Sequence, residues 1–378
     1  MKSPLFARAA GCEADVAPRV LIVDDSVVAR AVMGRMIDAS DRFSVAGAVA
    51  NVAAALDFLA RAEVDFILLD IEMPGTDGLT ALPDLIAAAR GAKVLIVSSS
   101  ADDGGAVTVQ ALALGAAETL VKPGSSAALS GRFGVALIDK LERLCEPVRP
   151  PSSTPEPIAV PTGMAVGQSV TPLPGAASPA VPRSSIDEYD VVAIGASTGG
   201  IHALSQLLRA LPPGFRLPIV ITQHLPASFM PYFAAQLAVL AGRPCDVATD
   251  SLRIRAGRIV VAPGDAHLKC VKLGDGGAAL RLVTDPSGTG CMPSVDSMLA
   301  TMATVYGPRM LAIVLSGMGR DGADGARRVR DAGGCVIAQD QASSVVWGMP
   351  GAVATSGIAD AVMTPDAIGR LVASRRRP

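Results

Sequence analysis

The sequence predicts an α/β protein with two folded parts, each built on a parallel sheet and separated by a proline-rich linker. Short apolar runs of strand length recur with helix-compatible stretches between them, which is typical of parallel α/β sheets. Hydrophobic residues make up 50% of the chain but aromatic residues only 3%, so we expect cores of Ala, Val, Leu and Ile. The length of 378 residues exceeds that of one typical domain, which is roughly 100 to 200 residues.

Charge and hydropathy exclude several classes of protein. The net charge of -2 gives no overall basic field for nucleic acid, and few aromatic residues are available to stack bases. The mean hydropathy is +0.42, but runs such as 20–23 and 310–315 are far shorter than the roughly 20 residues of a spanning helix. The first residues lack the apolar stretch of a signal peptide, so we expect a cytoplasmic protein without membrane insertion. The 6 cysteines form no C-x-x-C pair, and we expect most of them to be small buried hydrophobes.

The linker is predicted over residues 147–186. Ten of the 28 prolines fall there, and the stretch has no aromatic residue and almost no charge. Proline removes backbone hydrogen bonds, and no hydrophobic period is present to bury, so an extended, semi-rigid connection is expected. An ordered loop is the alternative, but structureless loops of this length are uncommon inside a compact domain. The folded parts are therefore predicted at 18–146 and 187–376.

The first folded part is predicted to be an open, mostly parallel sheet of five strands with helices on both faces. Such sheets bind ligands at the carboxyl ends of their strands. The five apolar runs that we interpret as strands lie at 20–23, 43–49, 66–69, 93–97 and 119–121.

Five residues at the ends of these strands suggest a phosphate-accepting pocket. Asp24 and Asp25 follow the first strand and Asp70 follows the third. Three converging carboxylates repel one another unless a divalent cation lies among them, and hard oxygen ligands indicate Mg²⁺. Asp70 is the candidate phosphate acceptor, while Lys122 and the hydroxyl of Ser98 are placed to contact phosphate oxygens.

This part of the chain resembles a two-component response-regulator receiver domain. The resemblance implies the flavodoxin-like fold, phosphorylation of Asp70 by a chemosensory histidine kinase, and Mg²⁺ held by Asp24, Asp25 and Asp70. One departure is Thr119, because receivers commonly carry an aromatic residue there; it puts the aromatic relay in doubt but not phosphorylation. The matching segments are LIVDDS at 21–26, LLDIEMPG at 68–75 with DG at 77–78, VS at 97–98 and VKP at 121–123.

The second folded part opens with an apolar strand at 191–194 that leads into the glycine-rich turn 195–200. A nucleotide-binding turn is one interpretation, but the G-x-G-x-x-G spacing is absent and no convincing ribose-binding acid ends the next strand. The same residues form a G-x-S-x-G elbow, which would present Ser197 as a nucleophile on a sharp turn.

A serine nucleophile requires a base, and the chain has 3 histidines. His224 follows the apolar run 217–223, at the end of the next strand, which is where a base is expected. His202 lies on the helix after the elbow and is expected to be exposed or to cap it. His267 lies at the start of a predicted hairpin that turns at 274–277. A structural role in this hairpin is expected, and a role facing the substrate is the alternative.

The acid that orients the base is expected after the strand 310–315. Asp321 and Asp324 both qualify by position, but Asp324 would lie on the following helix, where a solvated or capping acid is the simpler interpretation. Backbone N–H groups near Gly317, Met318 and Gly319 could face a tetrahedral oxyanion. The chain order Ser, His, Asp disfavours the α/β-hydrolase family, whose order is Ser, Asp, His.

Taken together, the second part resembles the catalytic domain of the chemotaxis response-regulator protein-glutamate methylesterases. By motif, the resemblance implies a triad of Ser197, His224 and Asp321, with Thr198 and Met318 at the oxyanion. It also implies a doubly wound, mostly parallel α/β domain with a β-hairpin. The small departures Leu225 and Trp347 do not touch the chemistry. The matching segments are GASTGG at 195–200, QHLP at 223–226, APGD at 262–265, PSVDS at 293–297, SGMGRDGA at 316–323 and QDQASSVVWGMP at 339–350.

The resemblance implies an esterase that demethylates glutamate methyl esters on chemoreceptors, releases methanol, deamidates receptor glutamines, and needs no cofactor for the ester chemistry. The unphosphorylated receiver is expected to cover the Ser197 cleft. One rival is a receiver fused to a DNA-binding output, which the near-neutral charge and glycine elbows disfavour. A second rival is a receiver-controlled adaptor whose hydrolase fold is inactive.

Overall fold

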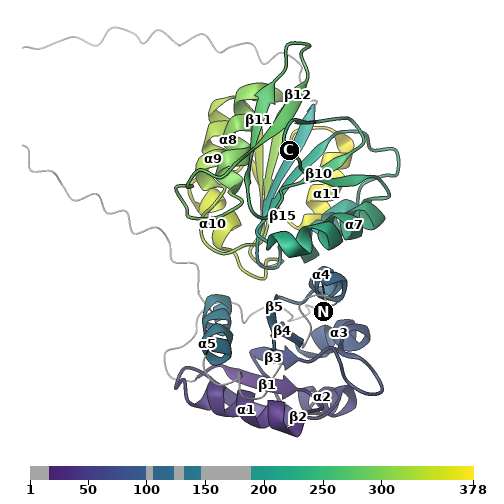
Figure 1. Cartoon of the computed structure of the whole chain (residues 1–378), viewed down its shortest axis with the longest axis vertical. Coiled ribbons are helices and arrows are strands. Elements are labelled where there is room, and N and C mark those ends of the chain that lie inside the picture. The colour runs from purple at the N-terminus through teal and green to yellow at the C-terminus, as the bar shows by residue number, and fades with distance from the viewer. Residues whose placement is uncertain (1–16, 99–104, 123–131, 146–188) are drawn as a thin grey trace, which may run out of the picture.

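The computed structural model describes residues 17–98, 105–122, 132–145 and 189–378, and the linker predicted at 147–186 lies outside these residues. The described residues form two α/β bodies, one below the other in Figure 1. We call residues 17–145 the N-terminal domain and residues 189–378 the C-terminal domain.

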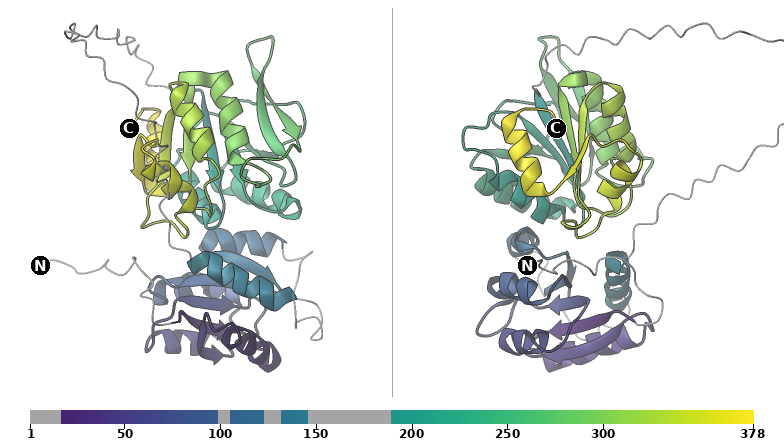
Figure 2. Two further views of the ribbon diagram at one scale, coloured as in Figure 1. Left: turned by 90° about the vertical axis from the view of Figure 1, so that its left-hand side faces the viewer. Right: turned by 180° about the vertical axis from the view of Figure 1, so that it is seen from behind.

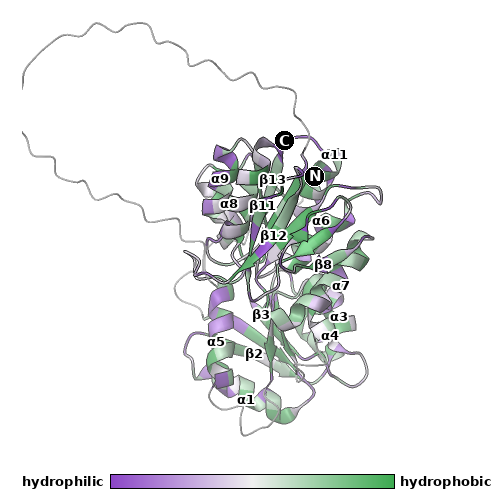
Figure 3. Cartoon of the chain, turned by 45° about the horizontal axis from the view of Figure 1, so that its top comes forward, coloured by the Kyte–Doolittle hydropathy of each residue, from purple (hydrophilic) through white to green (hydrophobic). Residues whose placement is uncertain are grey.

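The N-terminal domain contains a fully parallel five-stranded sheet in the order β2-β1-β3-β4-β5, as predicted. The three central strands β1, β3 and β4 are mostly apolar and buried, whereas the edge strands β2 and β5 are largely only partly buried. Hydrophobic colouring predominates in the sheet in Figure 3. The strands are β1 (Arg19–Val23), β2 (Ser44–Val49), β3 (Phe66–Leu69), β4 (Lys93–Ser98) and β5 (Glu118–Val121).

In the part of this domain that the structure describes, five helices cover the two faces of the sheet. Three of them begin at a side chain that accepts a hydrogen bond from the first turn, namely Ser26, Asn51 and Asp77. Residues of α2, α3 and α4 belong to the hydrophobic cluster on one face, and residues of α1 and α5 belong to the cluster on the other. The helices are α1 (Val27–Asp38), α2 (Val52–Leu59), α3 (Gly78–Ala88), α4 (Gly105–Leu114) and α5 (Arg132–Cys145).

The C-terminal domain is built on a seven-stranded sheet in the order β15-β14-β13-β6-β7-β10-β8, and every strand pairing in it is parallel. β6 lies at the centre, between β13 and β7, so the loops that follow these three strands meet at one edge. The strands are β6 (Val191–Ala196), β7 (Ile219–Gln223), β8 (Cys245–Val247), β10 (Ile259–Val261), β13 (Met310–Val314), β14 (Cys335–Gln339) and β15 (Ala361–Met363).

Helices pack on both faces of this sheet, which confirms the predicted doubly wound architecture (Figures 1 and 2). One face carries α6 (Gly200–Arg209), α7 (Met230–Ala241) and α11 (Pro365–Ser374). The other carries α8 (Val295–Tyr306), α9 (Ala323–Asp331) and α10 (Gly348–Thr355). Short 3₁₀ turns at Ala227–Phe229 (η2) and Gly307–Arg309 (η3) complete the domain. Within the described residues, no helix combines the length and the apolar character that crossing a membrane requires.

The predicted hairpin is present as β11 (His267–Lys272) and β12 (Ala278–Val283), which pair in antiparallel register. The sequence did not predict its third strand, β9 (Leu252–Arg253), which pairs with β12 to complete a separate small sheet. β11 packs against α8, so this small sheet supports the start of the helix that reaches the candidate site.

Candidate active site

The turn after β6 presents Ser197 at the carboxyl edge of the large sheet. The backbone N–H of Ser197 donates to the carbonyl of Ser316, which follows β13, at 3.0 Å. Gly199 has a φ of +75°, and a Cβ atom there would lie 2.5 Å from the side chain of Val345. The turn therefore needs glycine at this position both for its backbone conformation and for space. Ser197 is partly exposed, as a nucleophile must be.

His224 and Asp321 follow the two strands that flank β6, and they form a hydrogen-bonded pair. The His224 Nε2 atom lies 2.9 Å from Asp321 Oδ2. Asp321 has only 1% of its surface exposed. The strand order β13-β6-β7 explains why His224 and Asp321 lie close together, because neighbouring parallel strands have their carboxyl ends at the same edge of the sheet.

The Asp321 carboxylate is held by the amino end of α8. The Val295 N–H donates to Oδ2 at 2.8 Å, and the Asp296 N–H and the Ser294 hydroxyl donate to Oδ1 at 3.0 Å each. Burial acts to raise the pKa of Asp321, but the hydrogen bonds from His224 and from the backbone outweigh it and lower this pKa to about 2. Asp321 is therefore ionised, and it can stabilise a proton that arrives on His224.

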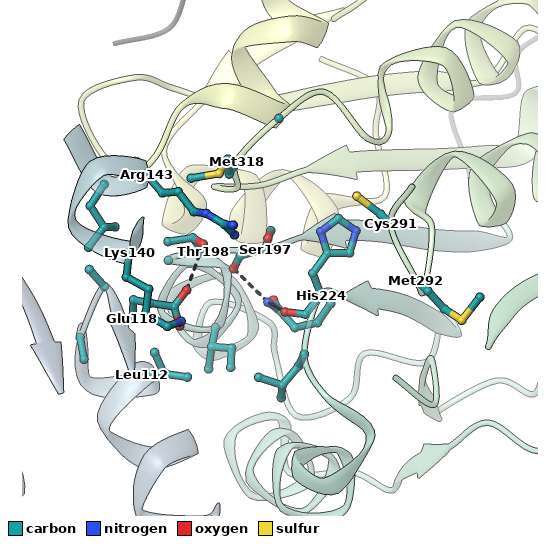
Figure 4. Close-up of a pocket in the computed structure, with 18 residues that line it drawn as sticks. Leu112, Glu118, Lys140, Arg143, Ser197, Thr198, His224, Cys291, Met292 and Met318 are labelled. Carbon is teal, nitrogen blue, oxygen red and sulfur yellow. Dashed lines mark hydrogen bonds and ion pairs between the residues drawn. The ribbon is translucent and has the colours of Figure 1, made fainter. Parts of the chain in front are cut away.

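Ser197 and His224 line one cavity of about 470 Å³, together with Thr198, Cys291 and Met318 (Figure 4). Between the Ser197 hydroxyl and the imidazole no hydrogen bond is present in the part of the chain that the structure describes. Asp321 holds Nε2 of His224, so Nδ1 is the ring nitrogen left to accept a proton from serine.

The predicted oxyanion donors have different environments. The Gly317 N–H donates to the carbonyl of Val346 at 3.0 Å, so the prediction that it faces an oxyanion is wrong. Thr198, Met318 and Gly319 line the cavity. The described residues provide no hydrogen-bond acceptor for the N–H groups of Thr198 and Met318, which are therefore available to a substrate oxygen.

Asp324 is on the first turn of α9, with an exposed side chain 3.7 Å from Arg320. Asp324 does not line the cavity, so Asp321 remains the candidate for the orienting acid.

The acidic pocket of the N-terminal domain also forms as predicted. One carboxylate oxygen from each of Asp24, Asp25 and Asp70 lies within 4.8 Å of the others. Lys122 Nζ is 2.7 Å from Asp24 Oδ2 and 2.7 Å from Asp70 Oδ2. Burial raises the pKa of Asp70 above its usual value, although Lys122 acts against this shift. Ser98 ends β4, and its carbonyl accepts from the Lys122 N–H at 2.7 Å. The donor set of carboxylate oxygens suits Mg²⁺.

Both domains match known families. Residues 20–133 match the family model of the response regulator receiver domain, and residues 192–372 match that of the CheB methylesterase. The protein-glutamate methylesterase/protein-glutamine glutaminase 1 of Paramagnetospirillum magneticum is 42% identical over 353 residues, which cover 91% of this chain and 92% of that protein. The chain belongs to the CheB methylesterase family. The predicted receiver and methylesterase folds and the family assignment are thus confirmed.

A second curated relative agrees with this assignment. The protein of the same name from Rhodospirillum rubrum is 40% identical over 355 residues, which cover 91% of this chain and 92% of that protein. Among solved structures, the chain is similar to the Thermotoga maritima CheB methylesterase catalytic domain, at 34% identity and a TM-score of 0.47. That match covers 49% of this chain and 97% of the crystallised domain.

The receiver domain forms one wall of the Ser197 cavity. Leu112, Glu118, Lys140 and Arg143 of the receiver line it, opposite Ser197 and His224 (Figure 4). The Thr198 hydroxyl donates to Glu118 at 3.5 Å, and Lys140 forms an ion pair with Glu118 at 3.3 Å. Receiver groups thus lie beside Ser197, the candidate nucleophile.

His202 takes part in the contact between the domains, so the prediction that it is exposed or caps its helix is wrong. Its Nδ1 atom lies 3.0 Å from the carbonyl oxygen of Ala113 on α4, and its Nε2 atom lies 2.8 Å from the amide nitrogen of Gln206. α4 packs against α6, η2 and α7 in the same contact, and Figure 1 shows α4 on the side of the receiver that faces α7. With Nδ1 protonated, the neutral ring donates to the receiver and accepts from Gln206.

His267 does not face the cavity and has 2% of its surface exposed. Its Nε2 atom lies 2.8 Å from the carbonyl oxygen of Asp285, and its Nδ1 atom accepts from the Ser294 N–H at 2.9 Å. The alternative of a substrate-facing role is therefore wrong, and His267 instead contacts the segment that holds Asp321.

Sequence reasoning missed Asp296 and Ser294, although both lie in the matching segment 293–297. Asp296 Oδ1 accepts from the N–H groups of Gly322 and Gly325, at 2.9 and 2.6 Å, and so ties down the loop that carries Asp321. Burial, together with the nearby Asp321 charge, raises the pKa of Asp296 to about 6. A serine followed by an apolar residue and Asp resembles a helix start, which was the signal available for both residues.

Proposed function

We propose that this protein hydrolyses the methyl esters of glutamate side chains on chemoreceptor signalling domains in the cytoplasm and releases methanol. Membership of the CheB methylesterase family and the names of its relatives support the reaction class. The observation that supports it most directly is the hydrogen bond between His224 and an ionised Asp321, in the cavity where Ser197 is partly exposed.

In the proposed first half-reaction, Ser197 Oγ attacks the ester carbonyl carbon while His224 Nδ1 takes the hydroxyl proton. Asp321 holds the ring by Nε2 and stabilises the imidazolium that forms. The N–H groups of Thr198 and Met318 would donate to the oxyanion. When the tetrahedral intermediate collapses, His224 returns the proton to the leaving oxygen and methanol departs.

The second half-reaction uses the same groups in reverse. Water gives one proton to His224 and attacks the acyl-enzyme carbonyl, and Ser197 then leaves with that proton. The product is a glutamate carboxylate. A glutamine side chain presents a comparable carbonyl, so the same residues would catalyse deamidation with ammonia as the leaving group.

The proposed control is phosphorylation of Asp70 by a chemosensory histidine kinase. Asp24, Asp25 and Asp70 would hold Mg²⁺, which supplies charge neutralisation during phosphoryl transfer, and Lys122 and Ser98 would contact the phosphoryl oxygens. The position of Glu118, Lys140 and Arg143 at the cavity supports occlusion of Ser197 by the unphosphorylated receiver. Phosphorylation would then shift the population toward an open arrangement.

The deciding experiment measures methanol release from methylated receptor membranes by the full chain and by its Ser197→Ala variant. We expect release by the parent chain and none above background by the variant. An inactive adaptor would release no methanol in either case. Covalent labelling by a serine-directed fluorophosphonate further distinguishes an active esterase from an inactive adaptor, because an adaptor should leave Ser197 unlabelled.

A further inference from the structure

Cys291 places a thiol next to two residues of the proposed triad, and the esterase chemistry has no use for it. One ligand atom from each of His224, Cys291 and Asp321 lies within 4.8 Å of the other two. The three residues come from different parts of the fold, namely the loop after β7, the segment before α8 and the loop after β13. Figure 4 shows the Cys291 sulfur beside the His224 ring.

The thiol is accessible and weakly held. Cys291 lines the Ser197 cavity and is only partly buried. Its hydrogen bond is a long contact of 3.9 Å from Sγ to the carbonyl of Thr289. A small ion that enters the cavity can therefore reach the sulfur without displacing a strong interaction.

The spacing of the three ligand atoms, all within 4.8 Å of one another, lies within reach of a tetrahedral zinc site. Zinc binds sulfur at about 2.3 Å and nitrogen or oxygen at about 2.0 to 2.2 Å, so ligand atoms of one site lie roughly 3.3 to 3.6 Å apart. His224 Nε2 and Asp321 Oδ2 are 2.9 Å apart and would have to separate slightly. His224 lines the cavity with 17% of its side chain exposed and can make this movement, whereas Asp321 is 1% exposed and is fixed by the start of α8.

We propose that His224, Cys291 and Asp321 bind Zn²⁺ and that this binding reversibly inhibits the enzyme. The inhibition rests on the proposed function, but the metal site does not. A thiolate, an imidazole and a carboxylate leave the fourth position of the ion to water, and this donor set selects zinc over Mg²⁺. The pocket of Asp24, Asp25 and Asp70 offers oxygen only, so the same chain would separate the two ions by donor type.

The mechanism of inhibition follows from which nitrogen the ion occupies. Zinc takes the Nε2 lone pair, so a neutral ring must carry its proton on Nδ1, the nitrogen that would accept the proton of Ser197. The base is thereby blocked. The Cys291 thiol gives its proton to solvent on binding, and no electron transfer is involved. Asp321 keeps its Oδ1 hydrogen bonds from Ser294 and Asp296 in this arrangement.

The test uses the full chain with millimolar Mg²⁺ to occupy the oxygen-only pocket. Zinc affinity is measured by competition with a chromophoric chelator, and access to Cys291 by iodoacetamide alkylation and peptide mass spectrometry. We expect zinc to protect Cys291 from alkylation, and Cys291→Ala to weaken zinc binding by at least about tenfold. Cys245→Ala, which removes a partly buried thiol on β8, is the matched control and should bind zinc like the parent chain.

Methanol release supplies the second readout, with each variant compared with its own zinc-free rate. The parent chain and Cys245→Ala should lose at least about tenfold in rate with zinc and recover with chelator, whereas Cys291→Ala should lose much less at the same zinc concentration. Equal zinc affinity, or equal inhibition, in Cys291→Ala and the parent chain would overturn the proposal. If zinc protects Cys291 but no preparation releases methanol, the metal site stands and the proposed function fails.

Discussion

The Nδ1 atom of His267 accepts a hydrogen bond of 2.9 Å from the backbone N–H of Ser294, the residue that caps α8. The Ser294 hydroxyl in turn donates to Asp321 at 3.0 Å, so a buried histidine on the small sheet fixes the residue that orients the proposed base. We therefore expect His267 to be a positioning residue rather than a catalytic one.

Replacing His267 should lower turnover more than substrate affinity. Because the Ser294 N–H loses its acceptor, we expect His267→Ala to lower kcat by about tenfold with little change in KM, which corresponds to about 1.4 kcal/mol of transition-state stabilisation. His267→Asn keeps an oxygen that can accept from Ser294 and should recover part of the rate. The prediction is tested by methanol-release kinetics of the parent chain and the two variants. An equal loss of kcat in both variants would contradict the positioning role.

The strand ends were predictable from sequence because the apolar runs mark where buried strands stop. Asp24 and Asp70 follow such runs, and so do Ser197 and His224, so parallel topology was enough to bring each set to one sheet edge. β9 has only two residues and shows no hydrophobic period, so it was missed.

Features that depend on contacts between distant segments could not be predicted. His202 has an amphipathic helical context that indicates a surface position, and only the docking of α4 reveals its hydrogen bond to Ala113. Ser294 and Asp296 act through the amino end of α8, and no local pattern shows which carboxylate that helix end will meet. Gly317 was predicted as an oxyanion donor because the local motif does not show that its N–H donates to the carbonyl of Val346, a residue distant in the sequence.

Asp321 and Asp324 make a matched pair for testing the orienting acid. Asp321 is buried and bonded to His224, whereas Asp324 is exposed on α9. Asp321→Asn removes the charge that stabilises the protonated base, so we expect methanol release to fall by about 10² to 10⁴. Asp324→Asn should leave the rate within about twofold, since an exposed ion pair contributes little. A comparable loss in both variants would mean that Asp321 has no special role.

Phosphorylation should require Asp70 and a divalent cation. Labelling with radioactive acetyl phosphate in the presence of Mg²⁺ should modify the parent chain and fail in Asp70→Asn. Chelation of Mg²⁺ should lower labelling by about tenfold or more, because the metal neutralises charge in the transition state. Glu72→Gln, which changes a carboxylate two residues away, is the control and should still be labelled. Labelling of Asp70→Asn would place the phosphoryl group on another residue.

Removing residues 1–186 should raise the basal rate of methanol release. The receiver lines the Ser197 cavity and interacts with Thr198 through Glu118, so its loss exposes the nucleophile. An increase of about tenfold would correspond to an occluded arrangement favoured by about 1.4 kcal/mol. If the truncated protein is no faster than the unphosphorylated full chain, simple occlusion is wrong.

His202→Ala tests the same contact without removing the receiver. The imidazole bridges Ala113 and Gln206, and the loss of one hydrogen bond of about 1 kcal/mol would shift the balance between docked and open arrangements about fivefold. We expect the basal rate of the unphosphorylated full chain to rise by up to this factor, with no effect of the same substitution in the chain that lacks residues 1–186. That second measurement is decisive, because His202 lies on the helix that follows Ser197. A change of rate in the truncated protein would show that the substitution disturbs the nucleophile turn itself, whereas a change confined to the full chain requires the receiver.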